Sequence, residues 1–164
     1  WHHYIVFPRP AEHEAGRVQR LHQKRTLCLA DEAHAIGLER RGHVWEREVL
    51  LRCDGEPVVF AHTVVPLSAT ANDWPLFSAL GERSLGTTLF YDPLVERGEL
   101  EFARIRPGHP LMQRACAALG CEGVTVLYAR RCLYRRKRGT LLVTEVFLPR
   151  VASLAPVPQR TNTQ

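Results

Sequence analysis

The chain has 164 residues, of which 45% are hydrophobic and 24% charged, a balance typical of one soluble globular domain. The net charge of +5 and the pI near 9.2 would suit nucleic acid or a membrane surface, but the arginines are scattered rather than arranged in a stripe. No apolar stretch reaches membrane-spanning length and no secretory signal is evident. We therefore expect a protein that neither binds nucleic acid nor inserts into a membrane.

Cysteine and histidine usage narrows the chemistry. The five cysteines are odd in number and form no Cys-x-x-Cys pair, which indicates reduced thiols and a cytoplasmic location. None of the eight histidines has the spacing of a zinc-binding helix, and no glycine-rich phosphate loop is present. The sequence therefore predicts no metal and no cofactor.

The N-terminal half begins with a strand candidate. Residues Arg17 to Thr26 fit a first strand, after which Asp31 is placed to cap a short helix that Gly37 would end. The next strand, Val44–Cys53, alternates with period two. One face, from Val44 through Glu46, Glu48 and Leu50 to Arg52, suits water.

The other face of that strand contains Arg47 among Trp45, Val49, Leu51 and Cys53. This face has the composition of a core, with one guanidinium in its middle. A buried cation without a partner costs several kcal/mol. Arg47 is therefore expected to meet a carboxylate, either of the protein or of a ligand.

A hairpin fixes the expected register of this strand. Asp54-Gly55 is a strong turn signal, and the chain returns as Val58–Val65. With a two-residue loop and no irregularity, Arg47 would lie opposite His62 on the same face. Two nitrogen-rich side chains side by side would favour an anion between them.

The middle of the chain predicts three helices. A loop over residues 68–72 precedes a short helix near Trp74–Leu80, and Ser84 is placed to cap a helix that continues to Phe90. The free amides of that helix start would either hold an anion or carbonyl or simply be capped. Pro110 opens a third helix, which runs through Ala118 and ends before Gly120.

The last part of the chain predicts a second strand pair. Thr125–Tyr134 and Thr140–Leu148 flank the basic run 135–138, which fits a solvated hairpin turn better than a phosphate-binding patch. Glu145 shares a strand face with apolar residues. Arg47 and Glu145 would then either form an internal salt bridge or occupy opposite ends of a dry pocket. Strands and hairpins dominate, so the fold class is α+β with an antiparallel sheet.

Several linked motifs resemble one bacterial enzyme family, chorismate pyruvate-lyase. They occur in order and at similar spacing: Arg47–Leu51 (REVLL), Asp54–Pro57 (DGEP), Thr63–Pro66 (TVVP), Leu85-Gly86, and Leu142–Pro149 (LVTEVFLP). The resemblance covers residues 17–149 and implies a single domain over 17–150. It also implies a six-stranded antiparallel sheet with flanking helices that enclose a buried ligand pocket. Residues 1–16 have no clear family counterpart, and 151–164 are expected to form a loose tail.

The resemblance also implies the reaction and the site. Family members convert chorismate to 4-hydroxybenzoate and pyruvate, the first step towards ubiquinone. Arg47 matches the arginine that binds the ring carboxylate, Glu145 the residue beside the ring oxygen, and Leu85 the leucine whose backbone holds the ligand. Related members can carry an arginine where this chain has His62, which we expect to bind substrate as a weaker, pH-sensitive cation.

The expected mechanism needs orientation and charge placement rather than a cofactor, because forming the aromatic ring supplies much of the driving force. We expect a monomer in which Glu145 is protonated part of the time and gives a proton to the leaving ether oxygen. The competing function is a sensor. Ligand-binding domains of bacterial regulators share this kind of fold and would bind an aromatic carboxylate without converting it.

Overall fold

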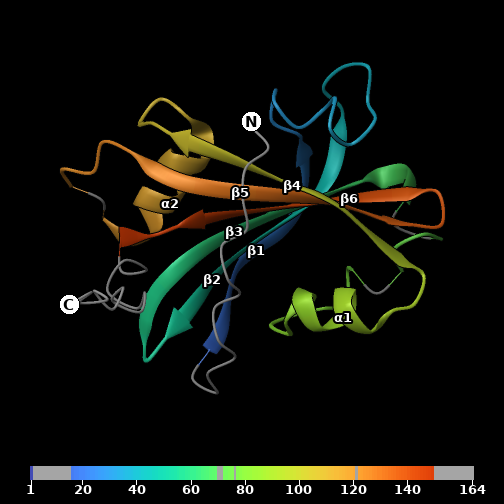
Figure 1. The fold of residues 1–164 in the computed structure, drawn as a ribbon, viewed down its shortest axis with the longest axis horizontal. Helices are drawn as coiled ribbons and strands as arrows, with labels where there is room; N and C mark the ends of the chain where they lie inside the picture. Colours follow the sequence, from blue (N-terminus) through green and yellow to red (C-terminus); the bar gives the residue numbers. More distant parts are fainter. Residues whose placement is uncertain (2–15, 70–71, 76, 121, 150–164) are drawn as a thin grey trace, which may run out of the picture.

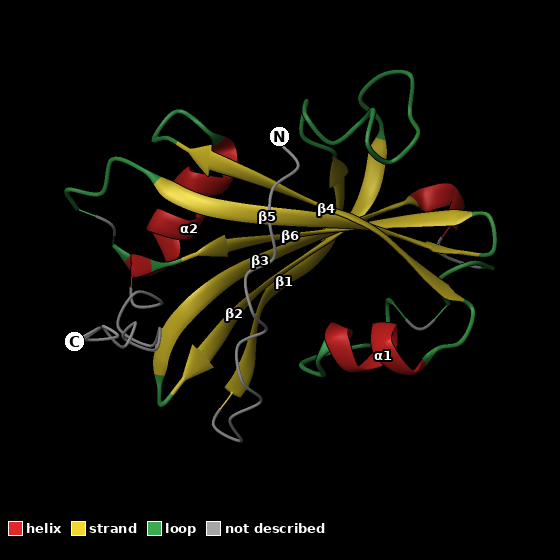
Figure 2. Cartoon of the chain, viewed as in Figure 1, coloured by secondary structure: helices red, strands yellow, loops and turns green. Residues whose placement is uncertain are grey.

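The molecule is built on one twisted sheet of six antiparallel strands (Figures 1 and 2). The computed structural model describes residues 1, 16–69, 72–75, 77–120 and 122–149. Along the sheet the strands follow the order β1-β2-β3-β6-β5-β4, so the β1-β2-β3 meander joins the β4-β5-β6 meander through the β3–β6 pair. The strands are β1 (Gly16–Leu27), β2 (His43–Cys53), β3 (Glu56–Pro66), β4 (Val95–Ile105), β5 (Leu127–Arg136) and β6 (Gly139–Phe147).

Five of the six strands agree with the alternation in the sequence, and the α+β class with a six-stranded antiparallel sheet is confirmed. The pattern alone did not predict β4. Most of its side chains are at least partly exposed, and a register irregularity lies between Arg97 and Leu100. An edge strand of this kind has no continuous apolar face to reveal it. The predicted basic turn is confirmed, because β5 ends at Arg136 and β6 begins at Gly139.

Two of the expected helices form. Helix α2 (Pro110–Leu119) has Pro110 at its first position and Gly120 in the left-handed conformation at its end, as predicted. Helix α1 (Leu85–Tyr91) begins after Ser84, although the Ser84 side chain makes no capping hydrogen bond. A short 3₁₀ helix, η1, covers Leu67–Ala69.

The other two expected helices are wrong. The segment from Asp31 to Gly37 is a series of turns, closed by bonds such as Leu38 N–H to the Ala33 carbonyl. The described residues of the 72–80 segment also form turns rather than a helix. Each segment buries apolar side chains against the sheet, and this tertiary packing replaces the periodic backbone bonding of a helix.

The two helices cover opposite faces of the sheet. Leu85 and Leu89 of α1 pack with Val65 and Leu141 on what we call the α1 face. Residues of α2 pack on the other side, the α2 face: Leu111, Met112 and Ala115 contact Leu50, Phe60, Ala129 and Val146. Figure 1 shows α1 and α2 near opposite ends of the twisted sheet. Among the described residues, no helix is long and apolar enough to cross a membrane.

The β2–β3 register differs from the expected one. The predicted two-residue turn forms, with Cys53 opposite Glu56, but the pairing shifts by one residue between Leu51 and Arg52. Beyond this irregularity Arg47 lies opposite Thr63, and His62 lies opposite Glu48. A one-residue shift moves a side chain to the other face of a sheet. The predicted pairing of Arg47 with His62 is therefore wrong.

Strand β2 also has no water-facing side. Glu46 and Glu48 are buried, as are Val44 and Leu50 on the same face, while Arg47 is buried on the other. The prediction that the glutamates face water is wrong, because α2 and the segment after β1 cover that face. Alternation identified which residues share a face, but it could not show what lies over each face.

Candidate active site

Arg47 lies on the α1 face and is 3% exposed. Its Nη2 donates to two backbone carbonyls, those of Gly81 (3.2 Å) and Arg83 (2.8 Å). Its Nε is buried and forms no hydrogen bond. No carboxylate of the described residues lies within ion-pairing distance of the guanidinium. Arg47 is therefore a buried cation that donates to two carbonyls and still has donors without a partner.

Burial, and then the positive charge of Arg20, lower the pKa of Arg47. An arginine nevertheless remains protonated at neutral pH. Desolvating such a charge without a counterion is unfavourable by several kcal/mol. An anion that reached Arg47 would gain a charge-assisted hydrogen bond in a place where water competes weakly.

Glu145 lies on the same face but has a different partner from the one predicted. Arg130 of β5, directly opposite it in the register, donates from Nε to Glu145 Oε2 at 2.7 Å. The Glu145 side chain is 26% exposed. The expected internal salt bridge between Arg47 and Glu145 is therefore wrong. The alternative, in which the two residues occupy opposite ends of a pocket, stays a prediction.

The register sets the distance between Arg47 and Glu145 on the α1 face. Arg47 pairs with Thr63, which pairs with Val143, and Glu145 is two residues farther along β6. Two strand spacings and two residues correspond to a Cα separation of about 12 Å. Both side chains belong to the α1 face of the sheet.

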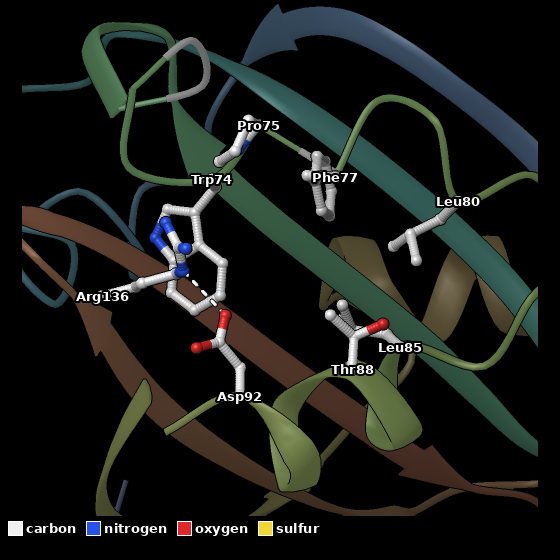
Figure 3. A pocket seen from close by; sticks show the side chains of 8 residues that line it. All are labelled: Trp74, Pro75, Phe77, Leu80, Leu85, Thr88, Asp92 and Arg136. Atoms are coloured by element: carbon white, nitrogen blue, oxygen red, sulfur yellow. Dashed lines mark hydrogen bonds and ion pairs between the residues drawn. The ribbon is translucent and has the colours of Figure 1, made fainter. Parts of the chain in front are cut away.

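The segment between η1 and α1 brings the third predicted residue to this face. Leu85 opens α1 and packs with Trp74, Phe77 and Leu80, and Figure 3 shows these side chains around a small pocket beside the helix. The same segment supplies the two carbonyls that bind Arg47. The Arg136–Asp92 ion pair (2.8 Å) lines the other end of this pocket. Leu85 is therefore on the same side of the sheet as Arg47 and Glu145, and its N–H belongs to the helix start, where amides lack intrahelical partners.

His62, the fourth predicted residue, belongs to the α2 face. It is fully buried, with Nε2 2.6 Å from Glu32 and Nδ1 2.7 Å from Glu48. Only an imidazolium can donate from both ring nitrogens. The prediction that His62 contacts the same ligand as Arg47 assumed that both lie on one face of the sheet, and they lie on opposite faces.

The carboxylates around His62 have further partners within the protein. Arg114 of α2 donates from Nη1 to Glu46 (3.0 Å) and to Glu48 (2.8 Å). His22 of β1 lies 2.8 Å from Glu46. Burial alone would lower the pKa of His62, but its bonds to the two glutamates outweigh this and raise that pKa to about 9. We call this set of charges the His62 network: Glu32, Glu46, Glu48, His22, His62 and Arg114.

Three ligand atoms in the His62 network, from His22, Glu46 and Glu48, lie within 4.8 Å of one another, which is close enough to surround a cation. The Arg114 guanidinium already bonds both of these glutamates. Both glutamates of this group therefore already have a cationic partner within the protein.

Sequence reasoning did not single out Arg130 or the buried glutamates. Arg130 could have been found from the sequence. Once the basic turn is assumed, the register of the hairpin places Arg130 directly opposite Glu145, and the alternation places it on the same face as Cys132. Glu46 and Glu48 gave no such signal, because they have the same spacing as solvent-facing residues. The four described cysteines are free, as expected.

Solved structures share the fold at low sequence identity. A GntR-family transcriptional regulator from Bacillus cereus superimposes with a TM-score of 0.63 at 13% identity, covering 87% of this chain and 98% of that one. The ligand-binding domain of a GntR-family regulator from Bordetella bronchiseptica gives 0.58 at 17% identity, covering 85% and 88%. At these identities the comparison establishes the architecture alone.

Sequence comparison is more specific. The chorismate lyase family model matches residues 10–156. A probable chorismate pyruvate-lyase from Ralstonia nicotianae is 49% identical over 87% of this chain and 74% of its own length. Those from Cupriavidus metallidurans and Nitrosomonas eutropha are 49% and 43% identical, over 90% and 86% of this chain and 69% and 79% of their own lengths. As the sequence motifs predicted, the chain belongs to the chorismate lyase family and is a lyase.

Proposed function

We propose that this chain converts chorismate to 4-hydroxybenzoate and pyruvate, the first step of ubiquinone synthesis, as a cytoplasmic monomer without metal or cofactor. The observation that carries the proposal is Arg47, a buried guanidinium with unused donors and, among the described residues, no carboxylate to neutralise it. Such a residue suits a ligand carboxylate. The ring of chorismate carries one.

Arg47 binds the ring carboxylate and thereby fixes the position of the ring. Glu145, about two strands away, accepts a hydrogen bond from the hydroxyl at the opposite end of the ring. The backbone at Leu85, where α1 begins, contributes a further contact. With both ends held, the ring is restricted to one orientation, and orientation is a large part of what this reaction requires.

The reaction balances without an external reagent. The bond between ring carbon 3 and the ether oxygen breaks, the ring loses the proton of carbon 4, and the enolpyruvyl group takes up a proton to leave as pyruvate. Glu145 Oε2 already accepts a hydrogen bond from Arg130 Nε. We therefore assign Glu145 a positioning contact with the ring hydroxyl, in place of the proton donation expected from the sequence.

The test is to mix the purified chain with chorismate and to quantify both products. Equal amounts of 4-hydroxybenzoate and pyruvate, formed at a rate proportional to protein concentration, are the expected result. The competing function is a non-catalytic sensor, whose fold the regulator domains share. Saturable binding of chorismate or 4-hydroxybenzoate without any product would reject the lyase proposal in favour of that sensor.

A further inference from the structure

Arg130 is a second guanidinium on the α1 face, where Arg47 and Glu145 also lie. It lies on β5 beside Glu145, and its side chain is 19% exposed. Its Cζ atom lies 5.4 Å from the ring centroid of Phe147, so one side of the guanidinium rests against an aromatic ring. Glu145 and Phe147 together restrict the rotamers of Arg130.

The Arg130–Glu145 bond uses only part of the guanidinium. Nε donates to Glu145, and among the described residues neither Nη atom has a hydrogen-bond partner. A guanidinium has five N–H donors in a planar fork, which suits a carboxylate that approaches from one side. Arg130 is therefore held in place by Nε while four donors on its Nη atoms remain for another group.

Chorismate requires a second cation that its aromatic product does not. Besides the ring carboxylate, it carries a carboxylate on the enolpyruvyl group, which is attached to the carbon next to the one bearing the ring hydroxyl. A ring held between Arg47 and Glu145 directs this second carboxylate towards the Glu145 end. Arg47 lies about 12 Å from that end. Arg20 lies close to Arg47, because its positive charge lowers the pKa of Arg47. Arg130, in contrast, is paired with Glu145 at that end.

We propose that Arg130 binds the enolpyruvyl carboxylate of chorismate and so makes the site selective for a dicarboxylate over its monocarboxylate product. This inference rests on the proposed function. Arg130 contacts the part of the substrate that leaves as pyruvate, whereas Arg47 contacts the part that becomes 4-hydroxybenzoate. Substrate and product therefore differ by one ion pair at Arg130.

The test compares the two ligands in Arg130→Gln. Loss of a charge-assisted hydrogen bond should lower kcat/KM for chorismate about 10- to 100-fold. The dissociation constant of 4-hydroxybenzoate, measured by calorimetry, should change by less than about threefold, because the product lacks the second carboxylate. Arg135→Gln is the matched control, since it removes the same charge from an exposed residue on the other face of β5 and should change neither value.

A second comparison separates direct contact from an effect through Glu145. In the Glu145→Gln background, the Arg130→Gln change should still weaken chorismate binding about 10-fold or more. The inference is wrong if Arg130→Gln has no effect on chorismate binding in the Glu145→Gln background. It is also wrong if Arg130→Gln alone weakens the binding of chorismate and of 4-hydroxybenzoate equally. In either case Arg130 only positions Glu145. Arg130→Lys keeps the charge, so it should recover part of the selectivity, and it provides the same comparison if the glutamine variant does not fold.

The proposed function fails in a different way. A wild-type protein that binds chorismate without product would reject turnover. The ratio of dissociation constants for chorismate and 4-hydroxybenzoate would then still report on Arg130. A ratio unchanged between wild type and Arg130→Gln would overturn the inference, and a ratio shifted against chorismate would support it.

Discussion

The two faces of the sheet bury charge in opposite ways. On the α2 face, His62 and Arg114 meet the carboxylates of Glu32, Glu46 and Glu48, so each charge has a counterion within the protein. On the α1 face, Arg47 is equally buried, but within the described part of the chain its partners are two backbone carbonyls. A network that is neutralised internally acts on the stability of the fold. A buried cation without a counterion lowers stability, and the proposed function gives Arg47 a ligand carboxylate as its counterion.

The largest effect is expected at Arg47. Arg47→Ala should lower kcat/KM for chorismate about 10²- to 10³-fold, because a desolvated ligand carboxylate loses its charged partner. Arg47→Lys should restore only part of this activity, since an ammonium lacks the planar fork. Steady-state kinetics with product quantification measures both variants.

The stability of Arg47→Ala provides the control. Its free energy of unfolding should stay level or rise, because the variant removes an unneutralised buried charge. Marked unfolding of this variant would show that Arg47 serves the fold, and wild-type turnover would remove it from the site. Either result would break the contrast between the two faces.

His62 should behave in the opposite way. His62→Ala leaves Glu32 without its cation and Glu48 with one fewer partner, so the free energy of unfolding should fall by about 3–5 kcal/mol. Below its own unfolding temperature, the variant should retain kcat/KM within about threefold, because His62 faces away from the predicted ligand. Urea denaturation gives the free energy of unfolding, and kinetics on the same preparation give kcat/KM. A folded but inactive variant would return His62 to the site.

The raised pKa of His62 makes its contribution pH-dependent. A histidine with a pKa near 6.5 unfolded and about 9 folded stabilises the protein fully below pH 6.5 and loses that effect as the pH rises through 9. Wild type should therefore lose up to roughly 3 kcal/mol across this range. His62→Gln, which cannot titrate, removes this part of the pH dependence. Parallel stability curves for the two proteins would contradict the assignment.

The smallest effect is expected from metal removal. Dialysis against EDTA should leave chorismate turnover unchanged, because no step of the proposed reaction uses a metal. The carboxylates of Glu46 and Glu48 are bonded by Arg114 on the opposite face. Restoration of a dialysed, inactive enzyme by zinc or magnesium would show that the α2 face contributes to chemistry after all.

The sequence by itself determined most of the strands, the helix from Pro110, both hairpin turns and the placement of Arg47 and Glu145 on strand faces. These features follow from local rules. Alternation, turn residues and a proline at a helix start act over a few neighbouring residues. The family motifs added the reaction class, which periodicity alone does not contain.

The tertiary structure decided which charges meet. The one-residue shift between Leu51 and Arg52 moved His62 to the other face, and no local pattern signals it. Arg130 reached Glu145 through strand pairing, while α2, more than 45 residues from β2 in sequence, supplied the Arg114 that neutralises Glu46. Alternation shows that two side chains share a face. Whether a buried charge there is neutralised depends on which distant segment packs over it.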